Sequence, residues 1–126
     1  PESCELHIMW GNTAVSVPIS TNVKDRIRAQ VEKALSADPV NPSAYGAAAT
    51  FYAEWDNNNA KALENINKAT AANPKAFWLF LQTAKIQQAM GDKVAAKASA
   101  EKCIAVATEA KNADYVRMAK ELIAKL

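Results

Sequence analysis

The first twenty residues alternate between apolar and polar side chains, and this alternation predicts two β-strands. Apolar residues recur at every second position over residues 5–10 and again over residues 15–19. Gly11-Asn12 separates the two runs, and glycine readily adopts the positive φ that a tight turn requires. The pattern predicts a β-hairpin whose second strand either is an edge strand at Pro18 or ends there, because proline has no N–H to donate to a neighbouring strand. Since an isolated hairpin is marginal in water, we expect it to pack on the rest of the chain or to belong to a larger sheet.

From Asn22 onward the apolar spacing becomes three or four residues, which is typical of helices. One apolar face predicts a first helix over residues 23–35, ended by the proline-containing segment 38–42. Further helices are predicted over residues 43–55, 60–72, 75–90 and 93–111. Asn73 is predicted to cap the fourth helix, with Pro74 at its first position, and Asp92 and Asn112 are predicted to cap the fifth and the last helix. A last helix carries the apolar stripe Tyr115, Met118, Ala119, Leu122, Ile123 and Leu126.

These elements predict a mainly α fold, in which an N-terminal β-hairpin precedes about six helices paired as antiparallel helical hairpins. The composition agrees with this, because 27 of the 126 residues are alanine and the chain has only 3 glycines and 5 prolines. The net charge is +2, and acids are interspersed among the bases, so no nucleic-acid-binding face is predicted. No apolar run has the length of a membrane span.

The residues that usually carry catalysis or bind metals are sparse. His7 is the only histidine, and it cannot share a strand face with Cys4, three residues earlier. Cys103 is interpreted as a small buried residue, while a disulfide to Cys4 stays open. Glu54 and Asp56 diverge by about 200° on a helix and so do not form a catalytic pair. We therefore expect no enzyme activity, no cofactor and no metal.

Comparing the chain with itself at an offset of 34 residues aligns several small and turn-forming residues. Asn58 meets Asp92, and three positions at helical spacing match, namely Ala62 with Ala96, Ile66 with Ala100 and Ala69 with Cys103. Small residues repeated on one helix face allow two antiparallel helices to approach closely. The sequence therefore predicts stacked helical hairpins in which many alanines are packing positions.

This pattern resembles the tetratricopeptide repeat, a unit of 34 residues with small or aromatic residues at set positions. The residues that carry the resemblance in the first unit are Tyr45, Ala48, Ala49 and Tyr52, then Ala62, Ile66, Ala69 and Pro74; those of the second are Ala84, Gly91, Asp92, Ala96, Ala100 and Cys103. We place a half-repeat at 22–37, repeats at 43–76 and 77–110, and a closing helix at 112–126. The fourth helix allows two registers, one through Leu79 and Ile86 and one through Phe80 and Ala84.

The resemblance implies a non-enzymatic module that binds a protein or peptide in a groove lined by the first helix of each repeat. The aromatic and polar residues of those helices that we assign to this groove are Phe51, Trp55, Trp78, Lys85 and Gln88. Only two full repeats are present, fewer than the three that an independent array usually needs. Self-association, or docking on another domain, would supply the missing burial.

The whole chain also resembles the C-terminal portion of a bacterial family of unknown function with a β-rich N-terminal module. The hairpin carries this resemblance through Leu6, Ile8, Trp10-Gly11 and Val15, Val17-Pro18-Ile19, together with Gly91-Asp92 and Ala95-Ala96 further on. It implies that residues 1–21 are the remnant of an upstream β-module, that the chain is the tail of a longer protein, and that the parent protein is periplasmic or secreted.

Two alternative functions stay open beside the binding module. The helices could brace an upstream β-module, with no external ligand. They could also form an accessory part of an enzyme whose catalytic residues lie outside this chain, in which case Lys85, Asp56 or Glu54 would point toward the hairpin side.

Overall fold

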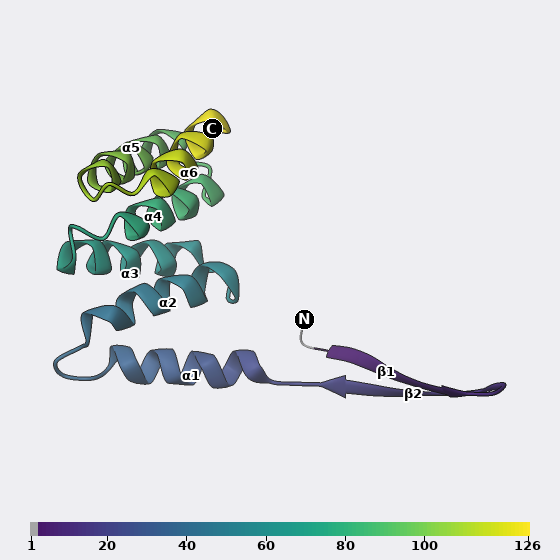
Figure 1. Cartoon of the computed structure of the whole chain (residues 1–126). Coiled ribbons are helices and arrows are strands. Elements are labelled where there is room, and N and C mark those ends of the chain that lie inside the picture. The colour runs from purple at the N-terminus through teal and green to yellow at the C-terminus, as the bar shows by residue number, and fades with distance from the viewer. Residues whose placement is uncertain (1–2) are drawn as a thin grey trace.

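Over residues 3–126 the protein consists of a β-hairpin followed by six helices, as the alternation and the helical spacing predict. The structure is a computed structural model that describes residues 3–126, so residues 1–2 of the expected hairpin unit lie outside it. The strands are β1 (Ser3–Trp10) and β2 (Thr13–Ser20), and the helices are α1 (Val23–Leu35), α2 (Pro42–Glu54), α3 (Asn59–Ala72), α4 (Phe77–Ala89), α5 (Lys93–Glu109) and α6 (Ala113–Ala124). Consecutive helices from α1 to α6 pack side by side in one stack, and α4 also contacts α6 (Figure 1).

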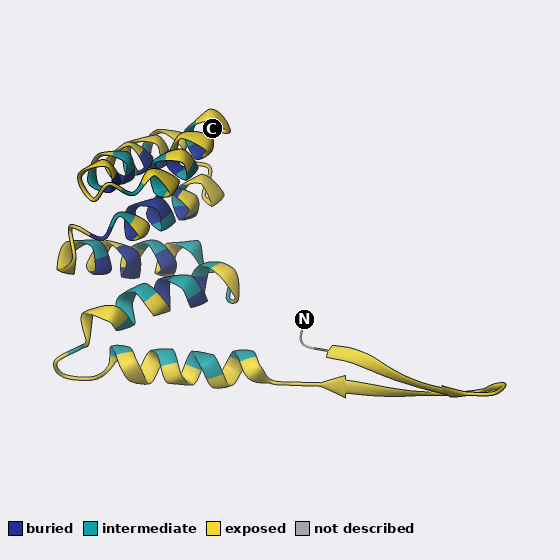
Figure 2. Ribbon diagram, in the orientation of Figure 1, coloured by how far each residue is buried: buried dark blue, intermediate teal, exposed yellow. Residues whose placement is uncertain are grey.

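The hairpin extends away from the helical stack, beyond the N-terminal end of α1 (Figure 1). Gly11 has a φ of +53°, and the strands pair antiparallel from Trp10 with Thr13 to Ser3 with Ser20. Both strands are edge strands, which accommodates Pro18. All described residues of the hairpin are exposed (Figure 2), so of the two alternatives it does not pack on the helices, and its membership of a larger sheet stays a prediction.

Three turns of the helical stack share one construction. A residue with positive φ, namely Asn57, Gly91 or Lys111, precedes a residue whose side chain caps the next helix. Asn58, Asp92 and Asn112 accept hydrogen bonds from the N–H groups of Lys61, Ala95 and Tyr115, respectively. The caps predicted at Asp92 and Asn112 are confirmed, and the caps at Asn58 and Asp92 repeat at the predicted offset of 34 residues.

The fourth helix begins later than predicted. Asn73 ends α3, and its carbonyl accepts a hydrogen bond from the N–H of Ala76, so Pro74 lies in a turn and Ala76 occupies the N-cap of α4. The predicted cap at Asn73 and the predicted helical position of Pro74 are wrong. The turn places the Ala76 side chain at 0 % exposure in the core, which a helix starting at Lys75 would alter.

Helix α4 lies between two hydrophobic cores, and this resolves the two registers of the sequence. Leu79 and Ile86 belong to a core shared with α2 and α3, whereas Phe80 and Ala84 belong to a second core shared with α5 and α6. Both registers are therefore buried at once. The paired positions at offset 34, from Ala62 with Ala96 to Ala69 with Cys103, are all buried as well. The predicted apolar stripe of α6 packs on the second core.

Helix α1 has no fully buried residue and joins the stack through one row of apolar residues and two ion pairs to Asp56. Ile27, Val31 and Leu35 pack against the first core, whereas Val23 stays exposed. Asp56, in the turn after α2, accepts a hydrogen bond from Arg28, and its Oδ1 lies 3.6 Å from Lys24 Nζ. The hydrogen bond from Arg28 is the largest cause that holds the pKa of Asp56 below its ordinary value.

We expect Asp56→Asn to destabilise the helical stack at neutral pH. Since the folded pKa of Asp56 is lower than the unfolded one, its contribution is present above the ordinary pKa and is lost as pH falls toward the lowered value. Urea unfolding of the wild type and the variant should therefore differ at pH 7 and converge below about pH 4. Asp114→Asn is the control, because the Asp114 side chain is 84 % exposed. A difference that persists unchanged into acid would contradict this role of the carboxylate.

Candidate functional site

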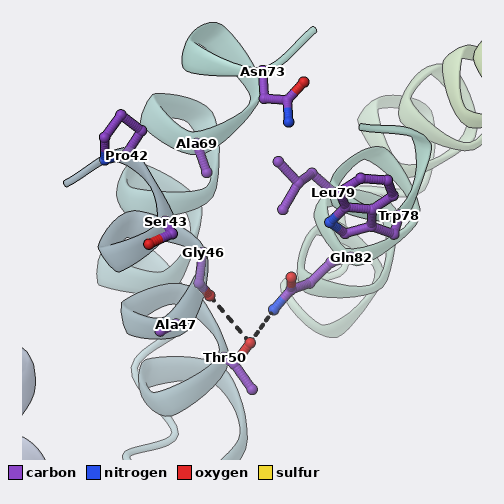
Figure 3. Close-up of a pocket in the computed structure, with 10 residues that line it drawn as sticks. All are labelled: Pro42, Ser43, Gly46, Ala47, Thr50, Ala69, Asn73, Trp78, Leu79 and Gln82. Atoms are coloured by element: carbon purple, nitrogen blue, oxygen red, sulfur yellow. Dashed lines mark hydrogen bonds between the residues drawn. The ribbon is translucent and has the colours of Figure 1, made fainter. Parts of the chain in front are cut away.

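A cleft of about 410 Å³ separates α2 from α4 and is more enclosed than the other hollows of the described residues. Its walls are built by α2, by the end of α3 and by the first half of α4 (Figure 3), from the residues Pro42, Ser43, Gly46, Ala47, Thr50, Ala69, Asn73, Trp78, Leu79 and Gln82. None of these ten side chains carries a charge. The lining is mostly apolar, with a few amide and hydroxyl groups, as is typical of sites that bind organic ligands or peptides.

Polar contacts join the two sides of this α2–α4 cleft. Gln82 Nε2 donates a hydrogen bond of 2.7 Å to Thr50 Oγ1, and Thr50 Oγ1 donates one of 3.2 Å to the carbonyl of Gly46 (Figure 3). The hydrogen bond from Nε2 orients the Gln82 amide, whose oxygen is a hydrogen-bond acceptor. The Asn73 side chain reaches over the same cleft from the end of α3 (Figure 3).

Trp78 supplies the largest side chain of the α2–α4 cleft. The indole is 47 % exposed, and its ring packs edge-on against Phe77, with ring centroids 5.1 Å apart. A half-exposed tryptophan held by one aromatic neighbour loses little conformational freedom when a ligand covers it. Trp78 is the one predicted groove residue that lines this cleft.

The other predicted groove residues lie elsewhere. Lys85 and Gln88 are exposed on α4 and line a shallower hollow of about 350 Å³ beside α6. Lys85 follows Trp78 by seven residues, so it lies about 10 Å further along α4 and on nearly the same face of the helix. The two hollows therefore lie on a single face made by α2, α4 and α6.

Phe51 and Trp55 do not join this face. Phe51 is only 4 % exposed and belongs to the first core, so it is a packing residue and its assignment to the groove is wrong. Trp55 is 47 % exposed, but it lies about 140° around α2 from Thr50 and lines neither hollow. The first-helix aromatics of the sequence are thus divided among core, cleft and open surface.

Sequence reasoning missed nine of the ten residues that line the cleft, all but Trp78. Apart from Leu79 and Pro42 they are small or polar residues, and no local pattern marks them as a cleft. The weak signal available was the row Trp78, Gln82, Lys85, whose spacing of four and three residues puts one aromatic and two polar groups on one helix face.

The residues considered for chemistry occupy structural or open positions. Cys103 is buried, as predicted, and burial raises the pKa of its thiol; it is also free. Cys4 is exposed and also free, so no disulfide joins them. His7 is an exposed hairpin residue 3.4 Å from Glu5. Asp56 is bound to Arg28.

Within residues 3–126, no three His, Cys, Asp or Glu side chains are grouped so that they could hold a metal ion. No helix over the same residues is both long and apolar enough to cross a membrane. No protein-family model matches the chain, and no curated protein matches it either.

Proposed function

We propose that the helical stack is a non-enzymatic, tetratricopeptide-like module that binds a peptide segment of another protein on the face made by α2, α4 and α6. The observation that carries the proposal is the α2–α4 cleft, where a half-exposed tryptophan stands beside fixed neutral polar groups. The repeat resemblance supports the same face, because the first helix of each repeat is expected to line the groove.

The lining of the cleft indicates the kind of peptide. Its uncharged walls favour an apolar side chain against Trp78 and Leu79, since an unpaired charge there would lose its hydration without compensation. The Gln82 and Asn73 amides can hydrogen-bond to peptide backbone groups. Lys85, about 10 Å away along α4, offers a positive charge at a distance that three residues of extended peptide would span.

A selection with random peptides displayed on phage tests this proposal. We expect the intact chain to enrich peptides with an apolar anchor, and we expect Gly46→Leu to abolish their binding because the new side chain would fill the α2–α4 cleft. Gly46→Ala is the matched control. Its Cβ would lie 3.6 Å from Leu79 Cδ2, an ordinary contact, and would leave the cleft open.

Equal binding of the enriched peptides to Gly46→Leu and to Gly46→Ala would place their site outside the cleft and overturn the proposal. Failure to enrich any peptide on the folded wild type would do the same. Far-UV circular dichroism of both variants establishes that the helical stack is intact.

A further inference from the structure

Helix α1 is held more weakly than the other helices of residues 3–126. Each helix from α2 to α6 has at least two buried residues, whereas α1 has none. Its apolar row, Ile27, Val31 and Leu35, is only half-buried against the first core, and its main packing partner is α2. Because segments with few buried apolar contacts open at the lowest free energy, α1 is the helix expected to open first.

The C-terminal end of α1 is incompletely packed. A hollow of about 240 Å³ lies there, between Leu35 and side chains of α2 and α3 that include Tyr45, Tyr52 and Asn65. A side chain beside a hollow has fewer neighbouring atoms and gains less dispersion energy than one that is enclosed. The last turn of α1 therefore adds little to the docking of the helix.

The N-terminal half of α1 is held by charged groups. Arg28 donates a hydrogen bond to Asp56, and Lys24 Nζ lies 3.6 Å from Oδ1 of the same carboxylate. The Asp56 side chain is only 16 % exposed, and its backbone N–H donates a hydrogen bond of 3.1 Å to the carbonyl of Phe51, at the end of α2. Two positive groups of α1 thus contact one carboxylate whose position is fixed by α2.

The segment 36–41 joins α1 to α2 at the opposite end of α1 from Asp56 (Figure 1). Residues 37–40 form no hydrogen bond with any other part of residues 3–126, and all of them except Val40 are exposed. Rotation about this segment would therefore break only the contacts of α1 itself. It has the properties of a hinge.

The hairpin must follow any movement of α1. Strand β2 ends at Ser20 and α1 begins at Val23, so only two residues separate them. The hairpin is exposed on all sides and packs on none of the helices (Figure 2). Residues 3–35 therefore form one unit, the hairpin–α1 arm, which contacts α2–α6 through α1.

We propose that the hairpin–α1 arm swings away from α2–α6 about the hinge at 36–41, and that the ionic contact at Asp56 holds it closed. The remaining helices keep both cores when the arm leaves, because no buried member of either core belongs to α1. The released α1, with 13 residues, loses helical structure, since isolated helices of this length are marginal in water. This inference does not rest on the proposed function, because it uses another element and other residues.

Limited digestion of the full chain with trypsin tests the proposal, because trypsin cuts segments that open. The trypsin sites of the arm all lie in α1, at Lys24, Arg26, Arg28 and Lys33. Cleavage after Lys33, in the last turn, reports departure of the whole helix and not fraying of its first turn. We expect this cleavage to be at least about thirty-fold faster than cleavage after Lys85 in α4 or Lys97 in α5, since those sites open only when a core unfolds.

Mass spectrometry of the digest should show that the fragment 34–126 accumulates, and far-UV circular dichroism should show that it stays helical. Equal rates of cleavage after Lys33 and after Lys85 would mean that α1 leaves only when the whole stack unfolds. That result, or a fragment 34–126 that never accumulates, would overturn the proposal.

Asp56→Asn tests the ionic contact without adding or removing a trypsin site. It should speed cleavage after Lys33 at least about five-fold, because a hydrogen bond between charged groups is lost. Asp114→Asn removes a carboxylate of the same charge from α6, where the side chain is 84 % exposed, and it should change this rate by less than about two-fold. An unchanged rate in Asp56→Asn, or an equal increase in both variants, would show that Asp56 does not hold the arm closed.

Discussion

Ala100→Leu is expected to lower the melting temperature of the helical stack by about 10 °C. Ala100 has 0 % exposure on α5 and belongs to the same buried cluster as Ala84 of α4 and Ala119 of α6, which are equally buried. Three helices thus bring alanines into one core, where a leucine has no space. Overpacking of this kind costs about 1–3 kcal/mol, and each kcal/mol shifts the melting temperature by several degrees in a chain of this length.

Ala105→Leu is the matched control for this prediction, because Ala105 is exposed on the same helix. It should change the melting temperature by less than about 2 °C, as surface substitutions do. Thermal unfolding followed by far-UV circular dichroism measures both variants. If Ala100→Leu melted with the wild type, the buried alanines would not be close-packed positions, and the repeat interpretation would lose its physical basis.

The caps at Asp92 and Asn112 were predictable from sequence because they act locally. The Asp92 and Asn112 side chains accept hydrogen bonds from N–H groups three residues later. The end of one helix, the capping residue and the first apolar residues of the next helix therefore all lie in one short segment of sequence. The hairpin was predictable for the same reason, with Gly11 at its turn. Cys103 followed from its place on an alanine-rich face.

The division of α4 between two cores was not predictable, because it depends on what packs on each side. The helix carries apolar residues on two of its sides, so each of its two registers matches a buried face equally well. Phe51 was misassigned for a related reason. An aromatic residue on a first helix fits both a core and a groove, and only the packing of α2 on α3 decides between them.

The α2–α4 cleft also depends on distant parts of the chain. Thr50 and Gln82 are 32 residues apart, and their hydrogen bond forms only because α3 positions α2 and α4 across from each other. The hairpin differs in another respect. Its alternation predicts a strand pair with one face to cover, but contains no information on what covers it.

Trp78→Ala is expected to weaken binding of a cleft-selected peptide by at least about thirty-fold. Tryptophans that anchor an interface in a concave site commonly contribute about 2 kcal/mol or more to binding. Trp78 is the only large aromatic residue lining the α2–α4 cleft, so no neighbour can replace it. Isothermal titration calorimetry with one selected peptide measures the change in the dissociation constant, and an unchanged melting curve shows that the fold is retained.

The comparison of Trp78→Ala with Trp55→Ala tests the central claim most directly. Both indoles are 47 % exposed, and only Trp78 lines the cleft, so the two substitutions remove the same exposed group from different surfaces. Binding on the α2–α4–α6 face predicts a loss of at least about thirty-fold for Trp78→Ala and a change within about two-fold for Trp55→Ala. Equal losses, or a loss confined to Trp55→Ala, would contradict it.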